Sequence, residues 1–313
     1  MYFERRPVMP VCQAGGVTML KRAAMHLTVA MIAACPAFAG EEAGPIPWRL
    51  EPVKTVEECK VPECVVADAG NALAYVSNIE ALPDQYWTDD GQGFISLMTS
   101  DGKVLKRRWL DSSPDAVLNA PKGMCILNDT LYLADNSRLL CRSLQPGGQL
   151  TNIPVPDAQR INDLATDGTC VYASDTARGV IYKVEPSSKT VTVLKAPPSV
   201  NGIVFHKGAF FAVSWDQHDI YELDPKGEAD PVPFGLAAYF AALDGIEVLD
   251  DGTFIVSDFN GNKIWAVGPD RKAIAPLADV KTPADIGLDR KRMLLYVPLF
   301  LQDEVAIFNI KND

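Results

Sequence analysis

The chain has 313 residues, of which 48% are hydrophobic and 22% charged, the proportions of a globular protein and not of a disordered or fibrous one. Its 29 basic and 40 acidic side chains give a net charge of −11, and no cluster of Lys and Arg is present, which argues against a nucleic-acid partner. The chain holds only three His and seven Cys, too few for a His-rich metal site or a disulfide scaffold.

The first predicted element is an export signal. Lys21 and Arg22 precede an apolar run over 23–34, and 37–39 offers small residues at the spacing that a signal peptidase requires. A run of about 12 residues is too short to cross a hydrocarbon core of about 30 Å, and no other apolar stretch approaches 18 residues. We therefore predict no transmembrane segment. A buried core helix is the alternative for 23–34.

This signal sets the expected location of the protein. We expect residues 1–39 to be a leader with its true start at Met19, which leaves 40–313 as a periplasmic or secreted protein. A lipid anchor at Cys35 is an alternative, because residues 32–35 resemble a weak lipoprotein box. Export implies an oxidising compartment.

Five cysteines remain after the leader, an odd number: Cys59, Cys64, Cys125, Cys141 and Cys170. Cys59 and Cys64 are close enough in sequence to close a small disulfide loop. The alternative is that all five are small buried hydrophobic residues. A redox pair is disfavoured because the Cys59–Cys64 spacing is not C-x-x-C.

The rest of the chain is built from repeats. A short β-prone phrase recurs six times, as AYVSN, LYLAD, VYASD, FFAVS, FIVSD and LYVPL. Its aromatic residues are Tyr75, Tyr132, Tyr172, Phe211, Phe254 and Tyr296. Successive aromatics are 57, 40, 39, 43 and 42 residues apart, and 82–93 is interpreted as an insertion that lengthens the first interval.

Further apolar phrases surround each copy. One strand follows after a turn, a third β-branched run often comes next, and another strand precedes each copy, as in PECVVAD, VNGIVFH and LDGIEVL. Four strands per unit, about 40 residues per unit and six units predict an all-β fold, a six-bladed β-propeller with four-stranded antiparallel blades around a central channel. A seven-bladed ring is the alternative, but a seventh copy is not found.

The ends of the predicted propeller must be joined, because open sheets leave unpaired edges. We expect residues 48–60 to pair with the last blade beside 304–310, so that 40–313 forms one closed domain. A monomer is expected.

The innermost strand of each blade lines the channel, and equivalent positions at its start carry Glu63, Lys122, Asn162, Asn201, Asp244 and Ala284. Converging polar groups are costly unless something binds them. Glu63, Asn201 and Asp244 offer oxygen ligands, which favours Ca²⁺, Mg²⁺ or Mn²⁺ over Zn²⁺ or copper. The alternative is that 201–202 and 244–245, Asn-Gly and Asp-Gly, are ordinary turn dipeptides.

Through these phrases, most of residues 62–310 resembles the superfamily of gluconolactonase, regucalcin (senescence marker protein) and luciferin-regenerating enzyme, in an exported bacterial branch. The resemblance implies a six-bladed propeller with one divalent metal in its channel. It implies that Glu63, Asn201 and Asp244 bind this metal and that Asp244 also acts as the base.

The same resemblance implies that Asn162, in RINDLATD, and Arg160 contact the substrate. Two features depart from the family pattern. The usual E-G-P phrase is E-C-V here at 63–65, and Lys122 introduces a cation at an equivalent blade position. We include Lys122 among the substrate-binding residues because it could orient a bound anion.

The resulting functional prediction is an exported, metal-dependent hydrolase of a sugar lactone or similar cyclic ester, with water activated by Asp244. We expect one divalent cation, Ca²⁺ in the first place, with Mg²⁺, Mn²⁺ or Zn²⁺ as alternatives. A Ser-His-Asp hydrolase is disfavoured because no nucleophile-elbow phrase accompanies His206 or His218. The alternative function is a non-catalytic periplasmic propeller that binds a small ligand or a protein partner.

Overall fold

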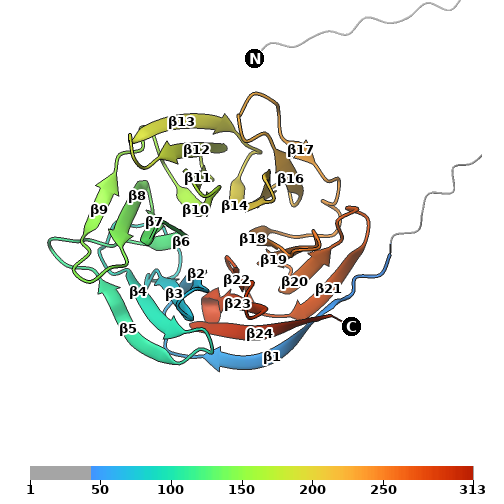
Figure 1. Ribbon diagram of the computed structural model, residues 1–313, viewed down its shortest axis with the longest axis horizontal. Helices are drawn as coiled ribbons and strands as arrows, with labels where there is room; N and C mark the ends of the chain where they lie inside the picture. Colours follow the sequence, from blue (N-terminus) through green and yellow to red (C-terminus); the bar gives the residue numbers. More distant parts are fainter. Residues whose placement is uncertain (1–43, 313) are drawn as a thin grey trace, which may run out of the picture. The chain divides into compact units, whose positions relative to one another are not determined.

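A computed structural model describes residues 44–312. The predicted leader over 1–39 and the candidate lipid site at Cys35 lie outside the described residues. The described chain forms six four-stranded antiparallel sheets arranged in a ring around a central channel (Figure 1). The predicted fold class is confirmed, since this is a six-bladed β-propeller.

The first three blades each take four consecutive strands, ordered from the channel outward. Blade one contains β2 (Pro62–Asp68), β3 (Leu73–Asn78), β4 (Phe94–Thr99) and β5 (Val104–Asp111). Blade two contains β6 (Pro121–Leu127), β7 (Thr130–Asp135), β8 (Arg138–Ser143) and β9 (Leu150–Ile153). Blade three contains β10 (Ile161–Thr166), β11 (Val171–Asp175), β12 (Val180–Glu185) and β13 (Thr190–Lys195).

Blades four and five follow the same order. Blade four contains β14 (Val200–His206), β15 (Ala209–Ser214), β16 (Ile220–Leu223) and the short β17 (Val232–Pro233). Blade five contains β18 (Leu243–Val248), β19 (Phe254–Asp258), β20 (Lys263–Val267) and β21 (Ile274–Asp279).

Blade six joins the two ends of the described chain. Its strands are β22 (Gly287–Asp289), β23 (Leu294–Leu299), β24 (Glu304–Asn312) and, outermost, β1 (Trp48–Val56). β1 runs antiparallel to β24 along its whole length, from Trp48 opposite Asn312 to Val56 opposite Val305 (Figure 1). The ring is therefore closed by hydrogen bonds between the first strand and the last.

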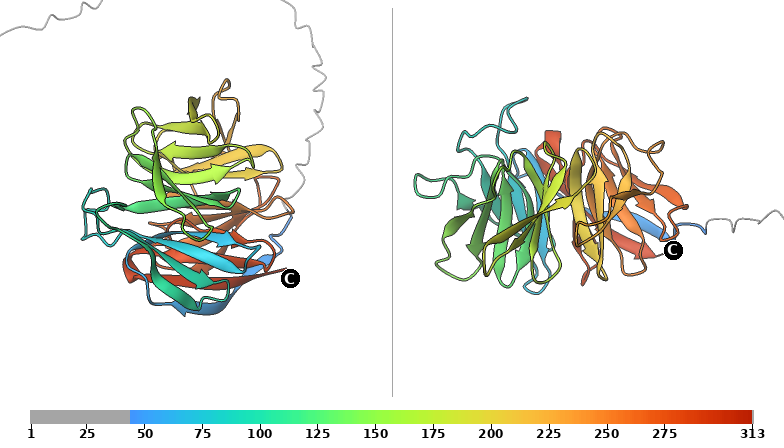
Figure 2. Two further views of the ribbon diagram at one scale, coloured as in Figure 1. Left: turned by 60° about the vertical axis from the view of Figure 1, so that its left-hand side comes forward. Right: turned by 90° about the horizontal axis from the view of Figure 1, so that it is seen from above.

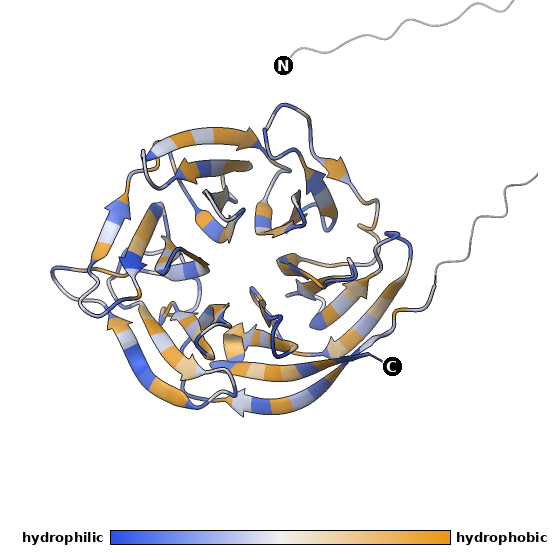
Figure 3. Cartoon of the chain, viewed as in Figure 1, coloured by the Kyte–Doolittle hydropathy of each residue, from blue (hydrophilic) through white to orange (hydrophobic). Residues whose placement is uncertain are grey.

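The hydrophobic core lies between neighbouring blades. Apolar and polar residues alternate in bands along the strands (Figure 3), as expected when one face of a strand packs on the next sheet. One cluster packs Tyr172 and Ile181 of blade three against Val200 and Phe210 of blade four. The second strand of each blade, which carries the repeated phrase, is almost fully buried.

Helical structure is nearly absent from the described part of the chain, where the 3₁₀ turn η1 (Phe300–Gln302) follows β23. Within residues 44–312, no helix has the length and apolar character needed to cross a membrane. Figure 2 shows the ring from the side, as a disc with loops extending from its faces.

All five cysteines in the described residues are free. Cys59 and Cys64 are both buried, but they pack in different hydrophobic clusters, one with Val56 and the other with Tyr75. The possible Cys59–Cys64 disulfide is therefore not present. The alternative interpretation, that these residues are small buried hydrophobic groups, describes four of the five; Cys141 is only half-buried.

Candidate functional site

Five of the six predicted site residues lie at irregularities in the innermost strands. In five blades, the pairing of the innermost strand with the next strand shifts register by one residue near the end where the innermost strand begins. The residues within these shifts include Glu63, Lys122, Asn162, Asn201 and Asp244. Such β-bulges redirect side chains out of the ladder, and here they bring them to one end of the channel, which we call the channel mouth.

The residue that follows each site residue explains the Asn-Gly and Asp-Gly phrases. A Cβ on Gly202 would lie 2.4 Å from the Asp244 carbonyl oxygen, and a Cβ on Gly245 would lie 2.5 Å from the Ile286 nitrogen. The glycines are needed because neighbouring innermost strands approach closely at the channel axis. Both phrases lie on strands β14 and β18, so their interpretation as turn dipeptides is wrong.

A cavity of about 920 Å³ opens at the channel mouth. Its lining includes every site residue predicted from the sequence: Glu63, Lys122, Arg160, Asn162, Asn201 and Asp244. The sixth equivalent position, Ala284, is buried in an apolar cluster and contributes no polar group. The roles assigned to these residues remain predictions.

The carboxylates at the mouth are held in an environment that disfavours their charge. Burial, followed by the nearby charge of Asp244, raises the pKa of Glu63 well above its ordinary value. Burial and the charge of Asp163 raise the pKa of Asp244 to about 7, against a lowering by a hydrogen bond from Asn201. Lys122 offsets part of this repulsion at both carboxylates.

Two buried oxygen atoms at this point have no hydrogen-bond partner, Oε2 of Glu63 and Oδ1 of Asn201. Buried polar atoms are rarely left unpaired. Oxygen donors with unused lone pairs beside a second carboxylate fit a hard divalent cation. Among residues 44–312 no group of three or more His, Cys, Asp or Glu could hold a metal ion, so this candidate site depends on the Asn201 amide oxygen.

Two cationic residues, Lys122 and Arg160, line the same cavity. The Lys122 ammonium donates to the Tyr86 carbonyl at 2.7 Å and lies 4.1 Å from the centre of the Trp87 ring. Burial lowers the pKa of Lys122 to about 8, so it is mostly charged at neutral pH. The Arg160 guanidinium lies 5.3 Å from the same ring, and Nδ2 of Asn162 donates to the Thr176 hydroxyl.

A second acidic pair lies one residue further along the channel. Asp163 accepts hydrogen bonds from the backbone of Leu164 and Ile203 at 2.6 and 2.7 Å. Burial raises the pKa of Asp163 to about 7, and burial with the charges of Asp163 and Glu63 raises that of Asp285 well above its ordinary value. Beyond this pair the channel opens into a smaller cavity of about 260 Å³, lined mostly by apolar residues.

Solved structures provide the comparison with known proteins. The chain resembles a catalytically inactive virginiamycin B lyase from Staphylococcus aureus, solved with quinupristin, at 14% identity and a TM-score of 0.59, over 84% of this chain and 99% of that one. The crystal structure of a protein provisionally named a gluconolactonase matches at 14% identity and a TM-score of 0.63, over 86% of this chain and 94% of that one.

A third match is an auxiliary nutrient binding protein from Bacteroides thetaiotaomicron, at 13% identity and a TM-score of 0.62, over 81% of this chain and 70% of that one. These likenesses show a shared fold. No protein-family model and no curated protein sequence matches the chain. Proteins named for a lyase, a lactonase and a binding function share this architecture, so the function must be argued from the site.

The aromatic residues of the mouth were not predicted from the sequence. Five aromatic side chains line the cavity: Tyr86, Trp87, Trp215, Phe259 and Phe300. The last three directly follow the repeated phrases of blades four, five and six, FFAVS, FIVSD and LYVPL. Extending each phrase by one residue would have revealed them.

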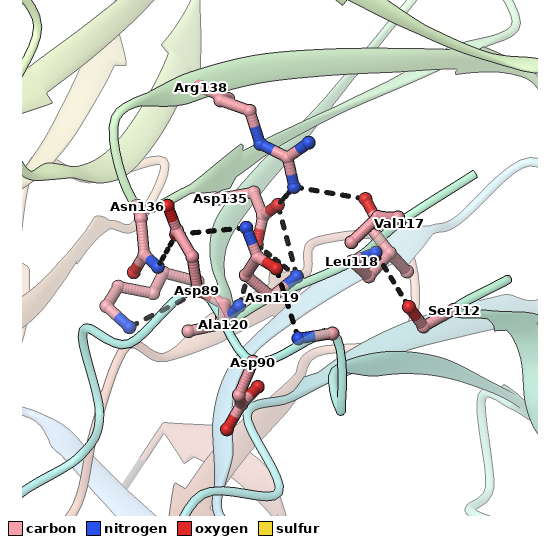
Figure 4. Close-up of polar contacts among 12 residues, drawn as sticks. Asp89, Asp90, Ser112, Val117, Leu118, Asn119, Ala120, Asp135, Asn136 and Arg138 are labelled. Carbon is pink, nitrogen blue, oxygen red and sulfur yellow. Dashed lines mark hydrogen bonds and ion pairs between the residues drawn. The ribbon is translucent and has the colours of Figure 1, made fainter. Parts of the chain in front are cut away.

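Tyr86 and Trp87 belong to the β3–β4 loop (79–93), which contains the predicted insertion and is anchored to blade two. The Asp89 carboxylate accepts hydrogen bonds from the side-chain amides of Asn119 and Asn136 at 2.9 and 2.6 Å (Figure 4). The Asn119 oxygen accepts a hydrogen bond in return from the Gly91 backbone at 3.1 Å. These contacts hold the loop against its neighbouring blade.

Proposed function

We propose that the protein is a metal-dependent hydrolase of a sugar lactone or similar cyclic ester. The observation that carries the proposal is the buried group of Glu63, Asn201 and Asp244, which lines the cavity and has two unpaired oxygens. The Glu63, Asn201 and Asp244 oxygens would hold the cation. A divalent cation bound there supplies Lewis-acid polarisation of the ester carbonyl.

Asp244 has the properties of a general base. Its carboxylate lines the cavity beside Glu63 and Asn201, where it can accept a proton from a water held there. As the water oxygen adds to the carbonyl carbon, its proton moves to Asp244. When the ring C–O bond breaks, the same proton passes to the departing alkoxide oxygen, which restores the carboxylate.

The polar side of the mouth would orient the substrate. Lys122 and Arg160 provide positive charge next to the reacting group, and the Asn162 amide can bind a hydroxyl or carbonyl oxygen. These residues come from blades two and three, whereas the base comes from blade five. Substrate would therefore be held between opposite parts of the ring.

The test is hydrolysis of a lactone panel by the 40–313 chain, with Ca²⁺ and after removal of divalent ions with a chelator. We expect activity to require the ion and to fall by about 10²- to 10⁴-fold in Asp244→Asn, the usual contribution of a general base. Asp250→Asn is the matched control, because its side chain is 88% exposed and lies outside the cavity. Full activity after chelation, or in Asp244→Asn, contradicts the proposal.

A second candidate function is ligand binding without chemistry. The large cavity supports it, and the similar structure of a nutrient binding protein shows that the fold occurs in that context. The Lys122 ammonium already contacts the Tyr86 carbonyl and the Trp87 ring. This arrangement suits a ligand-binding site as well as a catalytic site. A tightly bound ligand that is recovered unchanged after long incubation favours this function.

We also propose that the protein acts outside the cytoplasm, with the signal over 21–39 as the support. Expression of the full chain in a Gram-negative host should give a soluble periplasmic protein whose N-terminus is Gly40. An N-terminal lipidated Cys35 would indicate an anchored form instead. Recovery from the cytoplasm with an intact leader would contradict the proposal.

A further inference from the structure

The channel mouth has one aromatic side and one polar side. The residue that follows the second strand of each blade is, in blade order, Ile79, Asn136, Thr176, Trp215, Phe259 and Phe300. All of them except Asn136 line the cavity. Blades four to six thus contribute aromatic rings at the position where blades two and three contribute an amide and a hydroxyl.

The aromatic residues touch one another and form one surface. Ring centres are 5.3 Å apart between Trp215 and Phe259, 5.6 Å between Phe259 and Phe300, and 4.8 Å between Phe300 and Tyr86. We call these four residues the aromatic arc. Trp215, Phe259 and Tyr86 are only half-buried, so part of each ring remains open to a ligand.

Trp87 marks the boundary between the aromatic arc and the cations. It follows Tyr86 in the β3–β4 loop, and its ring lies 4.1 Å from the Lys122 ammonium and 5.3 Å from the Arg160 guanidinium. The loop is fixed by the Asp89 contacts shown in Figure 4, so this arrangement is built into the fold. The positive charges therefore lie next to one end of the apolar surface.

The size of the cavity also bears on its ligand. Its volume of about 920 Å³ is near the upper end of the range of about 300–1,000 Å³ that is typical for drug-sized ligands. A monosaccharide lactone is a single small ring and would cover only part of the four residues of the aromatic arc. An aromatic ligand would cover it, and aromatic contacts are among the strongest contributors to binding.

We propose that the site takes an aryl-substituted cyclic ester that also carries a carboxylate. The aryl group packs on the aromatic arc, and the carboxylate pairs with Arg160 and Lys122. The ester part of this assignment rests on the proposed function, whereas the preference for an aromatic carboxylate rests on the arc and the two cations alone.

The preference is tested by calorimetric binding of three probes to the Ca²⁺-loaded 40–313 chain. The probes are 4-phenylbutyrate, which has both features, 4-phenylbutan-1-ol, which lacks the charge, and gluconate, which lacks the ring. We expect phenylbutyrate to bind at least about tenfold more tightly than either of the others. Equal or tighter binding of gluconate, or no measurable binding of phenylbutyrate, overturns the inference.

Variants measure separately how much the aromatic arc and the cations contribute to phenylbutyrate binding. Trp215→Ala and Phe259→Ala should each weaken phenylbutyrate binding by about tenfold. Arg160→Ala, which leaves Lys122 as the remaining cation, should reduce the difference in affinity between phenylbutyrate and the alcohol. Tyr239→Ala is the control, because this ring is 56% exposed and does not line the cavity. Should an alanine variant not fold, Phe259→Leu keeps an apolar side chain but removes the ring, and unchanged binding by a folded Phe259→Leu counts against the aromatic contact.

Lactone hydrolysis measured in parallel separates this inference from the proposed function. Tight phenylbutyrate binding without hydrolysis of any lactone supports the ligand class and contradicts the enzyme. Hydrolysis of a lactone, together with tighter binding of gluconate than of phenylbutyrate, supports the enzyme and contradicts the ligand class.

Discussion

At the scale of single residues, the group at the channel mouth is arranged at a cost to stability. Glu63 and Asp244 are buried next to each other, and the Glu63 Oε2 atom has no hydrogen-bond partner. Natural proteins retain such groups at functional positions, where a ligand compensates them. A substitution of Glu63 should therefore change metal binding and the stability of the metal-free protein in opposite directions.

Replacing Glu63 by Gln should stabilise the metal-free protein at pH 8. The folded state holds the pKa of Glu63 above its unfolded value, so the glutamate loses stability as pH rises and the neutral amide does not. We expect an increase of about 1–3 kcal/mol in the free energy of unfolding, by chemical denaturation with a chelator present.

Glu63→Gln should at the same time lose most of the increase in Tm that Ca²⁺ gives the wild type. At pH 4 the two proteins should have the same stability, because the glutamate is then protonated in both states. A variant that is less stable at pH 8, or that keeps the full Ca²⁺ effect, would show that Glu63 has another role.

At the scale of structural elements, the site depends on how closely the innermost strands approach. Gly245 lies where a Cβ would be 2.5 Å from the Ile286 nitrogen in the next blade. Gly245→Ala should therefore push β18 away from blade six and destabilise the fold by about 1–3 kcal/mol. Gly70→Ala is the control, since its nearest atom would be at an ordinary 3.5 Å. Equal unfolding free energies for the two variants would refute this account.

A second prediction at this scale concerns the β3–β4 loop. Asp89→Ala leaves the side-chain amides of Asn119 and Asn136 without their acceptor, so the loop should be held less tightly against blade two. Limited proteolysis should then cut within 79–93 several times faster than in the wild type. Asp90→Ala, which removes only a local bond to the Gln92 backbone, should leave the cleavage rate unchanged.

How far the sequence predicts this molecule also becomes clear at the level of elements. The repeated phrases predict the strands because the aromatic residue of each phrase packs in a core between blades. The β-bulges and the Trp215–Phe259 contact were not predicted, because both depend on neighbouring blades and exist only in the closed ring. For the same reason, Gly202 and Gly245 look like turn residues in the sequence and are close-packing residues in the fold.

At the scale of the whole molecule, the channel carboxylates should make stability depend on pH and on metal together. Burial raises the folded-state pKa of Asp163 and Asp244 from 3.8 to about 7. Between about pH 4 and pH 7 the folded state thus binds more protons than the unfolded state. By linkage, the contribution of these groups to stability is complete below about pH 4 and is lost as pH rises through about 7.

The measurement is Tm across this range, with a chelator and with Ca²⁺. We expect Tm in chelator to fall from pH 5 to pH 8, and the Ca²⁺-induced increase in Tm to grow over the same interval, because metal ligands must be deprotonated. Glu63→Gln should show a smaller fall. A Tm in chelator that rises toward pH 8 would contradict the assigned pKa directions.

The closure of blade six by β1 and β24 has a consequence for the order of folding. During synthesis Trp48 emerges long before its partner Asn312, so the sixth sheet cannot be completed until Asn312 has been made. Contacts so distant in sequence slow folding, because the intervening chain must first be ordered. The newly made protein therefore passes through a period in which five sheets can assemble while the edge of the sixth is unprotected.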